Sequence, residues 1–360
     1  MHLTAISITS SLTNSTPSYS PYTLVMSTKT IAVVGATGTQ GGSVVRAFIS
    51  LPNWHVKALT RSSTSAKAQA LQNLGAEVVE ADMNDPESLV KAFDGAHAIF
   101  VNTDFWAPYT TALSQGKDQA TAQKIGYDTE ERHVKNAAYA ASKTSTLEKY
   151  IYSALGPMKD VSKGKYSHCH HWETKAAAVK YIENEVPELA KKTSYVYMAA
   201  YATNAFLYPK KDAETGEYIL AVPASKNLRL PVIDIEGSAG SFVRALVEDE
   251  PAGTKLLAYD SDLNILEAMD TWSRVTGQKA VFQSMTEEEM HKKTGLPYEV
   301  LDGAAYLDEH GYVEGVEGAI TPEQLSKPVK TDSFEEYLRK QDPKTLLSFE
   351  YRMPEPPAAK

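Results

Sequence analysis

Hydrophobic positions along the chain follow two alternating patterns. Short apolar runs typical of buried strands recur between longer stretches of helical spacing, such as the stripe formed by Val44, Val45, Phe48 and Ile49. Strands are expected at residues 31–34, 54–60, 76–82, 97–103, 149–153 and 194–198. Alternating strands and helices of this length predict an α/β fold with a doubly wound parallel sheet and right-handed crossovers.

Beyond the sixth strand the pattern changes to hairpins and amphipathic helices. Residues 208–222 read as a polar hairpin, Asp234 caps a helix, and helices are expected at 266–275 and 333–338. We therefore expect a smaller α+β C-terminal lobe. The predicted organisation is an extension at 1–28, a core at 29–155 joined by 171–204, a lobe formed mainly by 205–350, and a tail at 351–360.

A glycine-rich turn joins the first strand to the first helix. Gly35, Gly38 and Gly41 follow a β-branched run at three-residue spacing. Such a corner turns tightly, lets a pyrophosphate approach the backbone and packs helix against strand, and the helix N-terminus attracts phosphate. The pattern predicts a Rossmann-type dinucleotide site, which also includes Thr37, Thr39 and Gln40.

The end of the second strand indicates which dinucleotide binds. NAD enzymes usually place an acid there to accept hydrogen bonds from the ribose, whereas this strand ends in Arg61 and Ser62, with Lys67 nearby. A guanidinium suits a 2′-phosphate, so we predict NADP(H); a solvated surface arginine is the alternative.

Ligands of doubly wound sheets lie beyond the carboxyl ends of the strands. This rule places Asp82 and Met83 near the adenine, and Asn102, Thr103 and Ser153 near the nicotinamide. Polar strand-end residues without ligand contact are the alternative for each.

The chain resembles the NmrA-like family, an atypical branch of the short-chain dehydrogenase/reductase superfamily. The resemblance rests on residues 33–42, 58–61, 75–82 and 100–106 and on the motif His171-Trp-Glu-Thr-Lys175, and it extends from about residue 29 to the Phe334-Glu-Glu-Tyr-Leu segment. It implies a Rossmann fold and a nicotinamide nucleotide. It also implies a family in which some members catalyse and others sense nucleotide.

The resemblance assigns roles to one helical turn. Ordinary superfamily members use Tyr-x-x-x-Lys, and here His171 stands at the tyrosine position with Lys175 one turn later. The i, i+4 spacing puts both side chains on one face. Lys175 is expected to bind the cofactor ribose. His171 is either an acid/base, which its chemistry permits near neutral pH, or a plain hydrogen-bonding residue; Ser153 is the third candidate catalytic residue.

The run His168-Cys169-His170-His171 also suggests a metal site. Four adjacent side chains cannot all reach one ion, and no second pair with zinc-like spacing follows, so no metal is predicted. Cys169 is the sole cysteine, so the chain forms no internal disulfide and fits a reducing compartment.

Aromatic and polar residues at strand ends and loops predict a hydrophobic substrate cleft beside the nicotinamide. The alternative for each aromatic residue is ordinary core packing. The set comprises Phe105, Trp106, Tyr109, Trp172, Tyr201 and Asn204.

Composition narrows the class of partner. A net charge of −9 argues against direct binding of nucleic acid, and no stretch is long and apolar enough to span a bilayer. Residues 1–28 contain no charged side chain before Lys29 and lack the features of a targeting peptide; we expect a disordered extension, with Met26 as an alternative start. A cytoplasmic protein is expected, or a nuclear one if it is a regulator.

Two functions follow from these features. The first is an NADP(H)-dependent oxidoreductase acting on a hydrophobic carbonyl- or imine-bearing small molecule, with His171 or a water supplying the proton. The second is a non-catalytic redox sensor that binds NADP(H) and a regulatory protein such as a transcription factor. The aromatic set and Lys175 favour the catalyst.

Overall fold

The computed structural model describes residues 28–349 and is built around one large parallel sheet. Its strand order is β14-β11-β6-β5-β4-β1-β2-β3, and all pairs within it are parallel. The strands are β1 (Lys29–Val33), β2 (Trp54–Thr60), β3 (Glu77–Glu80), β4 (Ala98–Val101), β5 (Lys149–Ala154), β6 (Thr193–Met198), β11 (Lys255–Ala258) and β14 (Ala319–Ile320).

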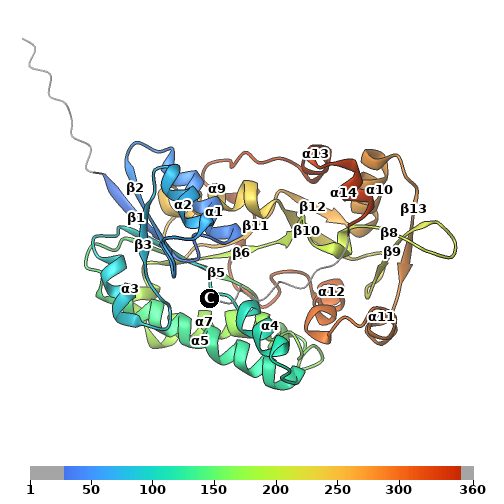
Figure 1. Cartoon of the computed structure of the whole chain (residues 1–360), viewed down its shortest axis with the longest axis horizontal. Coiled ribbons are helices and arrows are strands. Elements are labelled where there is room, and N and C mark those ends of the chain that lie inside the picture. Colours follow the sequence, from blue (N-terminus) through green and yellow to red (C-terminus); the bar gives the residue numbers. More distant parts are fainter. Residues whose placement is uncertain (1–27, 350–360) are drawn as a thin grey trace, which may run out of the picture.

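Helices cover both faces of this sheet, so its central strands are buried from two sides (Figure 1). Ile31, Ile99 and Ile151 on three neighbouring strands are fully buried, which explains the continuous apolar runs in the sequence. The helices of this region are α1 (Thr39–Ile49), α2 (Ala66–Asn73), α3 (Pro86–Phe93), α4 (Trp106–Ser114), α5 (Gln119–Lys143), α6 (Met158–Val161), α7 (His170–Glu185), α8 (Pro187–Ala190) and α9 (Ile235–Glu248).

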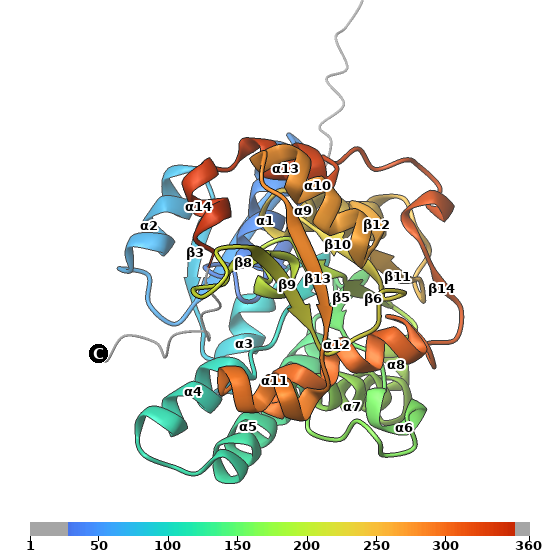
Figure 2. The ribbon, with the colours of Figure 1, turned by 90° about the vertical axis from the view of Figure 1, so that its right-hand side faces the viewer.

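The remaining elements form a smaller lobe with its own core (Figure 2). Two three-stranded sheets, β12-β10-β7 and β13-β9-β8, pack with helices around the fully buried Trp272 and Tyr306. The elements are β7 (Ala200–Tyr201), β8 (Lys210–Lys211), β9 (Tyr218–Val222), β10 (Arg229–Ile233), β12 (Ser261–Asn264), β13 (Ala280–Ser284), α10 (Ile265–Thr276), α11 (Glu287–Thr294), α12 (Tyr298–His310), α13 (Phe334–Lys340) and α14 (Pro343–Leu347), with 3₁₀ turns at Ala205–Leu207 and Pro322–Gln324.

The predicted fold class is confirmed, and most predicted elements lie where the pattern placed them. β2 has the predicted bounds, whereas β3 and β4 are shorter than predicted at both ends. The polar hairpin is formed by antiparallel β8 and β9. The side chain of Asp234 accepts a hydrogen bond from the Gly237 amide at 3.1 Å and caps α9 as expected.

One helix and two strands that follow residue 205 return to the large sheet instead of joining the smaller lobe. Helix α9 packs against α1 so closely that a Cβ on Gly240 would lie 2.2 Å from the Ser43 carbonyl oxygen. Gly240 also donates its amide to Ser43 Oγ at 2.9 Å. The helix capped by Asp234 therefore belongs to the core, as do β11 and β14.

The predictions for the two ends of the chain lie outside the described residues, apart from Thr28. These are the extension at 1–28 with its alternative start at Met26, and the tail at 351–360. Among the helices of residues 28–349, none combines the length and apolar character needed to cross a membrane.

Candidate functional site

The glycine corner has the shape that a pyrophosphate requires. Gly35 turns the chain at φ +74°, and Gly38 precedes α1 as an N-cap without a side chain. The first turn of α1 contains no acidic residue, and Gly38 and Thr39 are exposed to solvent while Thr37 is half-buried. The amides that open this helix thus have no side-chain cap, and the helix start is at the surface at Thr39, whereas Gln40 and Gly41 are buried.

Two further observations fit a bound dinucleotide at this corner. A Cβ on Gly41 would lie 2.2 Å from the Gly35 carbonyl oxygen, so the close approach of helix and turn needs glycine. Gln40 is buried and donates Nε2 to the Tyr201 hydroxyl at 2.6 Å, while its Oε1 has no hydrogen-bond partner among the described residues. Gln40 therefore packs against Tyr201 with an unpaired acceptor buried beside the turn.

The strand-end corner that follows β2 holds both a cation and an anion. Arg61 and Lys67 are exposed and Ser62 is half-buried. The end of β3 contributes Glu80, whose Oε1 accepts hydrogen bonds from the Ser63 amide at 2.9 Å and from Ser63 Oγ at 2.6 Å. An acid from the neighbouring strand therefore lies beside the end of β2, bound to Ser63.

The loop after β3 is fixed by polar contacts from α5. Burial acts to raise the pKa of Asp82, but hydrogen bonds from Asn84 and the charges of Arg61 and His133 lower it overall. Asn84 Oδ1 accepts from Arg132 at 3.0 Å and lies 3.2 Å from His133 Nε2. The Met83 carbonyl oxygen accepts a hydrogen bond from Asn136 at 2.8 Å. Arg61 thus lies on the same side of the sheet as the predicted adenine loop.

The end of β4 receives Lys175 from α7. Its Nζ donates to the Thr103 carbonyl oxygen at 3.1 Å and lies 3.5 Å from Asn102 Oδ1. A Cβ on Gly35 would lie 3.3 Å from the Asn102 carbonyl oxygen, so Lys175 and the glycine corner meet at one residue. Four predicted cofactor residues are thus brought together: Gly35, Asn102, Thr103 and Lys175.

A fully buried carboxylate lies beneath Lys175. Glu130 of α5 is 0% exposed, and its Oε1 lies 3.0 Å from Lys175 Nζ. Thr103 Oγ1 donates to Oε1 at 2.6 Å, and Thr174 Oγ1 donates to Oε2. A buried carboxylate is tolerated only when paired and hydrogen-bonded, and this one satisfies both conditions.

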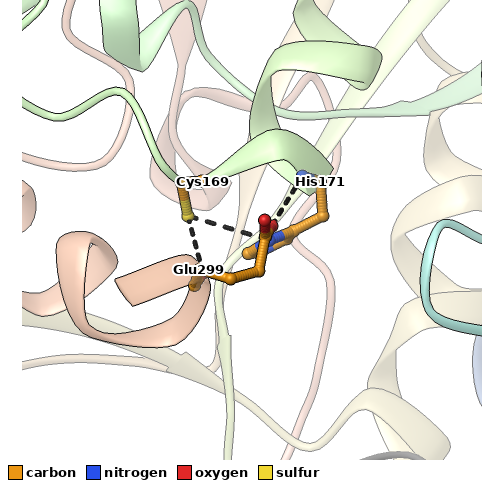
Figure 3. Close-up of side chains that lie close together, drawn as sticks. All are labelled: Cys169, His171 and Glu299. Carbon is orange, nitrogen blue, oxygen red and sulfur yellow. Dashed lines mark hydrogen bonds and ion pairs between the residues drawn. The ribbon is translucent and has the colours of Figure 1, made fainter. Parts of the chain in front are cut away.

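His171 is bound to a second buried carboxylate, Glu299, which comes from α12 of the smaller lobe (Figure 3). Glu299 Oε1 accepts from the His171 amide at 2.9 Å and from Nδ1 at 2.7 Å. Burial acts to raise the pKa of Glu299, but the hydrogen bonds from His170 and His171 lower it to about 2. The carboxylate is therefore ionised at neutral pH.

Glu299 and Asp302 together hold the start of α7. Glu299 Oε2 accepts from Gln123 at 3.0 Å and lies 3.2 Å from His170 Nδ1. Asp302 accepts the His168 amide at 2.9 Å. Cys169, the N-cap of α7, gives no side-chain cap, so carboxylates of the smaller lobe satisfy these amides instead.

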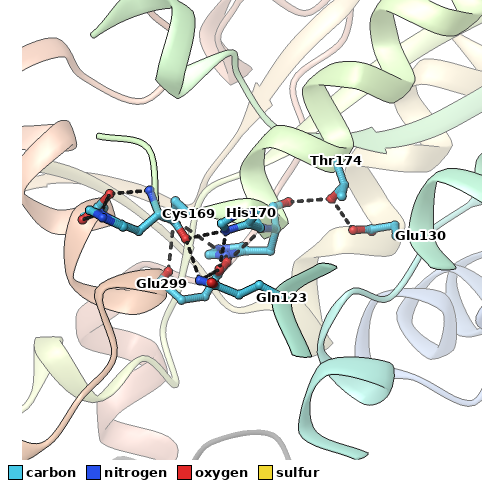
Figure 4. A network of polar contacts seen from close by, with 9 residues as sticks. Gln123, Glu130, Cys169, His170, Thr174 and Glu299 are labelled. Atoms are coloured by element: carbon cyan, nitrogen blue, oxygen red, sulfur yellow. Dashed lines mark hydrogen bonds and ion pairs between the residues drawn. The ribbon is translucent and has the colours of Figure 1, made fainter. Parts of the chain in front are cut away.

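The polar contacts continue from the start of α7 through Thr174 to Glu130 (Figure 4). Thr174 Oγ1 lies 3.4 Å from the His171 carbonyl oxygen and also donates to Glu130. The network links the second lobe, the helix with both motif residues and the end of β4.

Cys169, His171 and Glu299 bring three possible metal-ligating atoms within 4.8 Å of one another, a juxtaposition that the sequence did not predict. The Cys169 sulfur lies 3.2 Å from the Glu299 carbonyl oxygen, a contact that requires the thiol proton. Burial, together with the charges of Glu299, Asp302 and Glu173, raises the pKa of this thiol. A metal ion at this place would have to displace the thiol proton of Cys169 and the proton between His171 and Glu299, because only deprotonated groups are ligands.

The predicted substrate residues divide into three groups. Trp106 lies against His171 with ring centroids 4.8 Å apart, and Phe105 and Tyr109 are buried beside Trp106. Trp172 is buried in the second lobe's core against Tyr306, at a ring-centroid distance of 5.8 Å. The others are Tyr201 at the glycine corner and Asn204 at the start of a 3₁₀ turn. Ser153, predicted as a catalytic residue, is buried within β5.

Three acids of this site, Glu80, Glu130 and Glu299, are absent from the sequence prediction. Glu130 could have been found from the sequence. Ala122, Gly126 and Val134 form a buried stripe at four-residue spacing on α5, and Glu130 is the charged residue within that stripe. Glu299 could not, since it lies 128 residues beyond His171 and no local pattern marks it.

The parallel sheet and its glycine corner define a Rossmann-type α/β protein. The profile of the NmrA-like family matches residues 27–338, and the chain belongs to this family. The predicted family is thereby confirmed.

Known proteins resemble the chain over most of its length. The NmrA-like oxidoreductase hkm9 of Aspergillus hancockii is 29% identical over 75% of this chain and 79% of its own. The NmrA-like oxidoreductase malD of Malbranchea aurantiaca is 28% identical over 69% of this chain and 74% of its own.

Solved structures share the fold. NmrA, described as a negative transcriptional regulator and solved in complex with NADP, has a TM-score of 0.61 at 22% identity, covering 87% of this chain and 95% of that one. Citrobacter sp. triphenylmethane reductase, complexed with NADP(H), has a TM-score of 0.62 at 19% identity, covering 86% and 99%.

Proposed function

We propose that the protein is an NADP(H)-dependent oxidoreductase of a hydrophobic small molecule. The observation that carries this proposal is the position of Lys175. Its Nζ lies at the end of β4 beside Asn102, which adjoins the Gly35 turn, while His171 lies one helical turn earlier on α7. A cation for the ribose and a proton-exchanging side chain thus share the edge of the sheet where nucleotides of this fold bind.

The chain's own residues would hold the cofactor in three places. The amides opening α1 would bind the pyrophosphate, Arg61 the 2′-phosphate, and Lys175 the nicotinamide ribose. When bound, the nicotinamide supplies or accepts hydride. Glu130 keeps Lys175 in place, and His171 gives a proton to the substrate heteroatom that becomes negative as hydride arrives.

The substrate class follows from what surrounds His171. The rings of Trp106 and Phe105 lie 4.8 and 6.1 Å from its imidazole ring, so an apolar carbonyl or imine compound fits this neighbourhood better than a charged one. The relatives hkm9 and malD, both called oxidoreductases, support reductive chemistry. Solved structures of the same fold contain NAD or NADP, which supports a nicotinamide nucleotide, while the choice of NADP(H) rests on Arg61.

The test is turnover by the purified protein. NADPH and NADH consumption is measured with a panel of hydrophobic aldehydes, ketones, quinones and imines, beside the His171→Ala variant. We expect NADPH oxidation with at least one compound and its loss in the variant. A panel without turnover, combined with tight NADPH binding, contradicts the proposal and favours the nucleotide sensor, the role for which the solved NmrA regulator is the precedent.

A further inference from the structure

Glu299 makes two contacts to His171 with one oxygen. Oε1 accepts both the main-chain amide at 2.9 Å and Nδ1 at 2.7 Å. A carboxylate ionised at neutral pH has no proton to donate, so the Nδ1 contact requires the proton on the imidazole. His171 therefore carries hydrogen at Nδ1, and Nε2 is the nitrogen whose proton can be exchanged.

We propose that Glu299 is the positioning residue of His171, holding its Nδ1 proton and its ring orientation so that Nε2 exchanges a proton with substrate. The inference rests on the proposed function and adds to it a residue from the second lobe. Glu299 does not touch the reacting atoms in this arrangement; it acts through His171.

The carboxylate is well placed for this role because it is rigidly held. Glu299 is 0% exposed, and its second oxygen accepts Gln123 Nε2 at 3.0 Å and lies 3.2 Å from His170 Nδ1. Its main-chain oxygen receives the Cys169 thiol at 3.2 Å. Every side of the group is fixed by α5, α7 or the loop before α7, so the imidazole ring has one favoured orientation.

The proton balance of the step is simple. In reduction of a carbonyl, a nicotinamide held at the glycine corner and Lys175 would supply the hydride for the new C–H bond, and the carbonyl oxygen would gain the π electrons. Nε2–H of the protonated imidazole breaks as the new O–H bond forms. His171 is left neutral with its proton on Nδ1, still donated to Glu299, and Nε2 takes up one H⁺ from solvent, which is the proton consumed in each turnover.

The chain offers a matched control for a purely structural role. Asp302 is a second buried carboxylate on α12, and it also accepts an amide at the start of α7, that of His168. It does not contact His171. Asp302→Ala therefore removes a buried carboxylate from the same helix but leaves the contact between His171 Nδ1 and Glu299 in place.

The first experiment reads the tautomer directly. Protein labelled with ¹⁵N-histidine is studied by long-range ¹⁵N–¹H NMR, and the His171 signals are identified by their loss in His171→Gln. We expect the Nδ1–H form in the unmodified protein, a shift toward Nε2–H in Glu299→Ala, retention of Nδ1–H in Glu299→Gln, and no change in Asp302→Ala. An Nε2–H form in the unmodified protein overturns the proposal, and this reading needs no variant to fold.

The second experiment uses turnover with a substrate found in the panel. Glu299→Ala is expected to lower kcat at least about tenfold, up to the 10²–10⁴-fold typical of lost general acid catalysis, with KM and NADPH affinity nearly unchanged. Glu299→Gln should recover part of this loss, because its Oε1 still accepts both protons. Equal kcat losses in Glu299→Ala and Asp302→Ala would mean that the carboxylate only caps α7.

Two remaining outcomes separate this proposal from its alternatives. One equivalent of zinc in the purified protein, lost in Cys169→Ala, would overturn the proposal. The imidazole nitrogen would then coordinate the metal through its lone pair and would not donate a proton to Glu299. An Nδ1–H tautomer in a protein without any turnover would support the positioning of His171 and overturn the oxidoreductase function instead.

Discussion

Lys175 and Glu130 form an ion pair with 3.0 Å between Nζ and Oε1, in which the carboxylate is fully buried and the lysine side chain is 12% exposed. The pair lies directly under the edge of the sheet that we assign to the cofactor. The carboxylate has two threonine hydroxyls as further donors. Glu130 therefore acts as an anchor that keeps a long, flexible cation at one position.

Removing either partner of this pair should be costly, whereas removing both should cost less. Glu130→Gln and Lys175→Met are each expected to lower the free energy of unfolding by about 3 kcal/mol, since one buried charge is left alone. The double variant should lose less than the sum of the two. Urea denaturation measures this, with Asp128→Asn in the exposed Lys124–Asp128 pair as a control that changes little. Strictly additive losses would show that the two groups do not interact.

The glycine corner allows a separation of fold from binding. A Cβ on Gly38 would lie 3.2 Å from the Gly35 carbonyl oxygen, whereas on Gly41 it would lie at 2.2 Å. Gly38→Val should thus abolish nucleotide binding while the protein stays folded, and Gly41→Ala should also destabilise it by about 1–3 kcal/mol through overpacking. Thermal denaturation and NADPH fluorescence titration test both, with Gly42→Ala as the tolerated control. Unchanged NADPH affinity in folded Gly38→Val would remove the corner from the site.

The corner after β2 predicts opposite effects for its two charges. Arg61→Asp should weaken NADP(H) binding by roughly 1–3 kcal/mol and NAD(H) binding much less, because only NADP(H) has a 2′-phosphate. Glu80→Gln should strengthen NADP(H) alone, since it removes the anion that Ser63 now binds. Calorimetric titration of both nucleotides measures these changes. Equal losses for NADP⁺ and NAD⁺ in Arg61→Asp would contradict the assignment.

The sequence was sufficient where function depends on local spacing. The glycines of the first turn, and His171 with Lys175 one turn apart, can be read because a strand-turn-helix unit and a helical face are local structures. The acidic residues Glu299 and Glu80 could not be predicted from local sequence patterns. Glu299 reaches His171 across 128 residues, and Glu80 reaches Ser63 from a neighbouring strand, so both depend on how the elements pack.

The same limit explains the helix α9. Its cap at Asp234 and its apolar face are visible in the sequence, but both are equally compatible with either lobe. Its place was decided by the contact of Gly240 with Ser43 on α1, a close approach between two helices far apart in the chain. Element type was therefore predictable from periodicity, whereas the lobe to which the element belongs was not.

Glu299 should make the free energy of unfolding depend on pH in the acidic range. Its pKa in the folded protein is about 2, below the ordinary 4.5, so the carboxylate contributes stability that is complete above about pH 5 and is lost as the pH falls toward 2. The contribution is on the order of 3 kcal/mol. Urea denaturation at several pH values should show Glu299→Gln less stable than the unmodified protein at pH 7, with the gap narrowing below pH 5. A constant gap from pH 7 to pH 3 would contradict the ionised, hydrogen-bonded state of this group.

Substitution of the two α7 motif residues, His171 and Lys175, should affect turnover and nucleotide affinity differently. His171→Ala is expected to reduce turnover by about 10²–10⁴-fold with nucleotide affinity almost unchanged, because it removes only the proton donor. Lys175→Ala should reduce both, since its ammonium lies at the strand end assigned to the ribose and its loss leaves Glu130 unpaired. Stopped-flow NADPH oxidation and fluorescence titration measure the two quantities on the same protein. If the protein is a sensor, no compound of the panel is turned over by the unmodified protein or by either variant. The affinity for a regulatory partner then differs between the NADP⁺ and NADPH forms, and that partner changes the relative affinity for the two nucleotides by the same factor. Turnover that His171→Ala abolishes excludes a purely regulatory role.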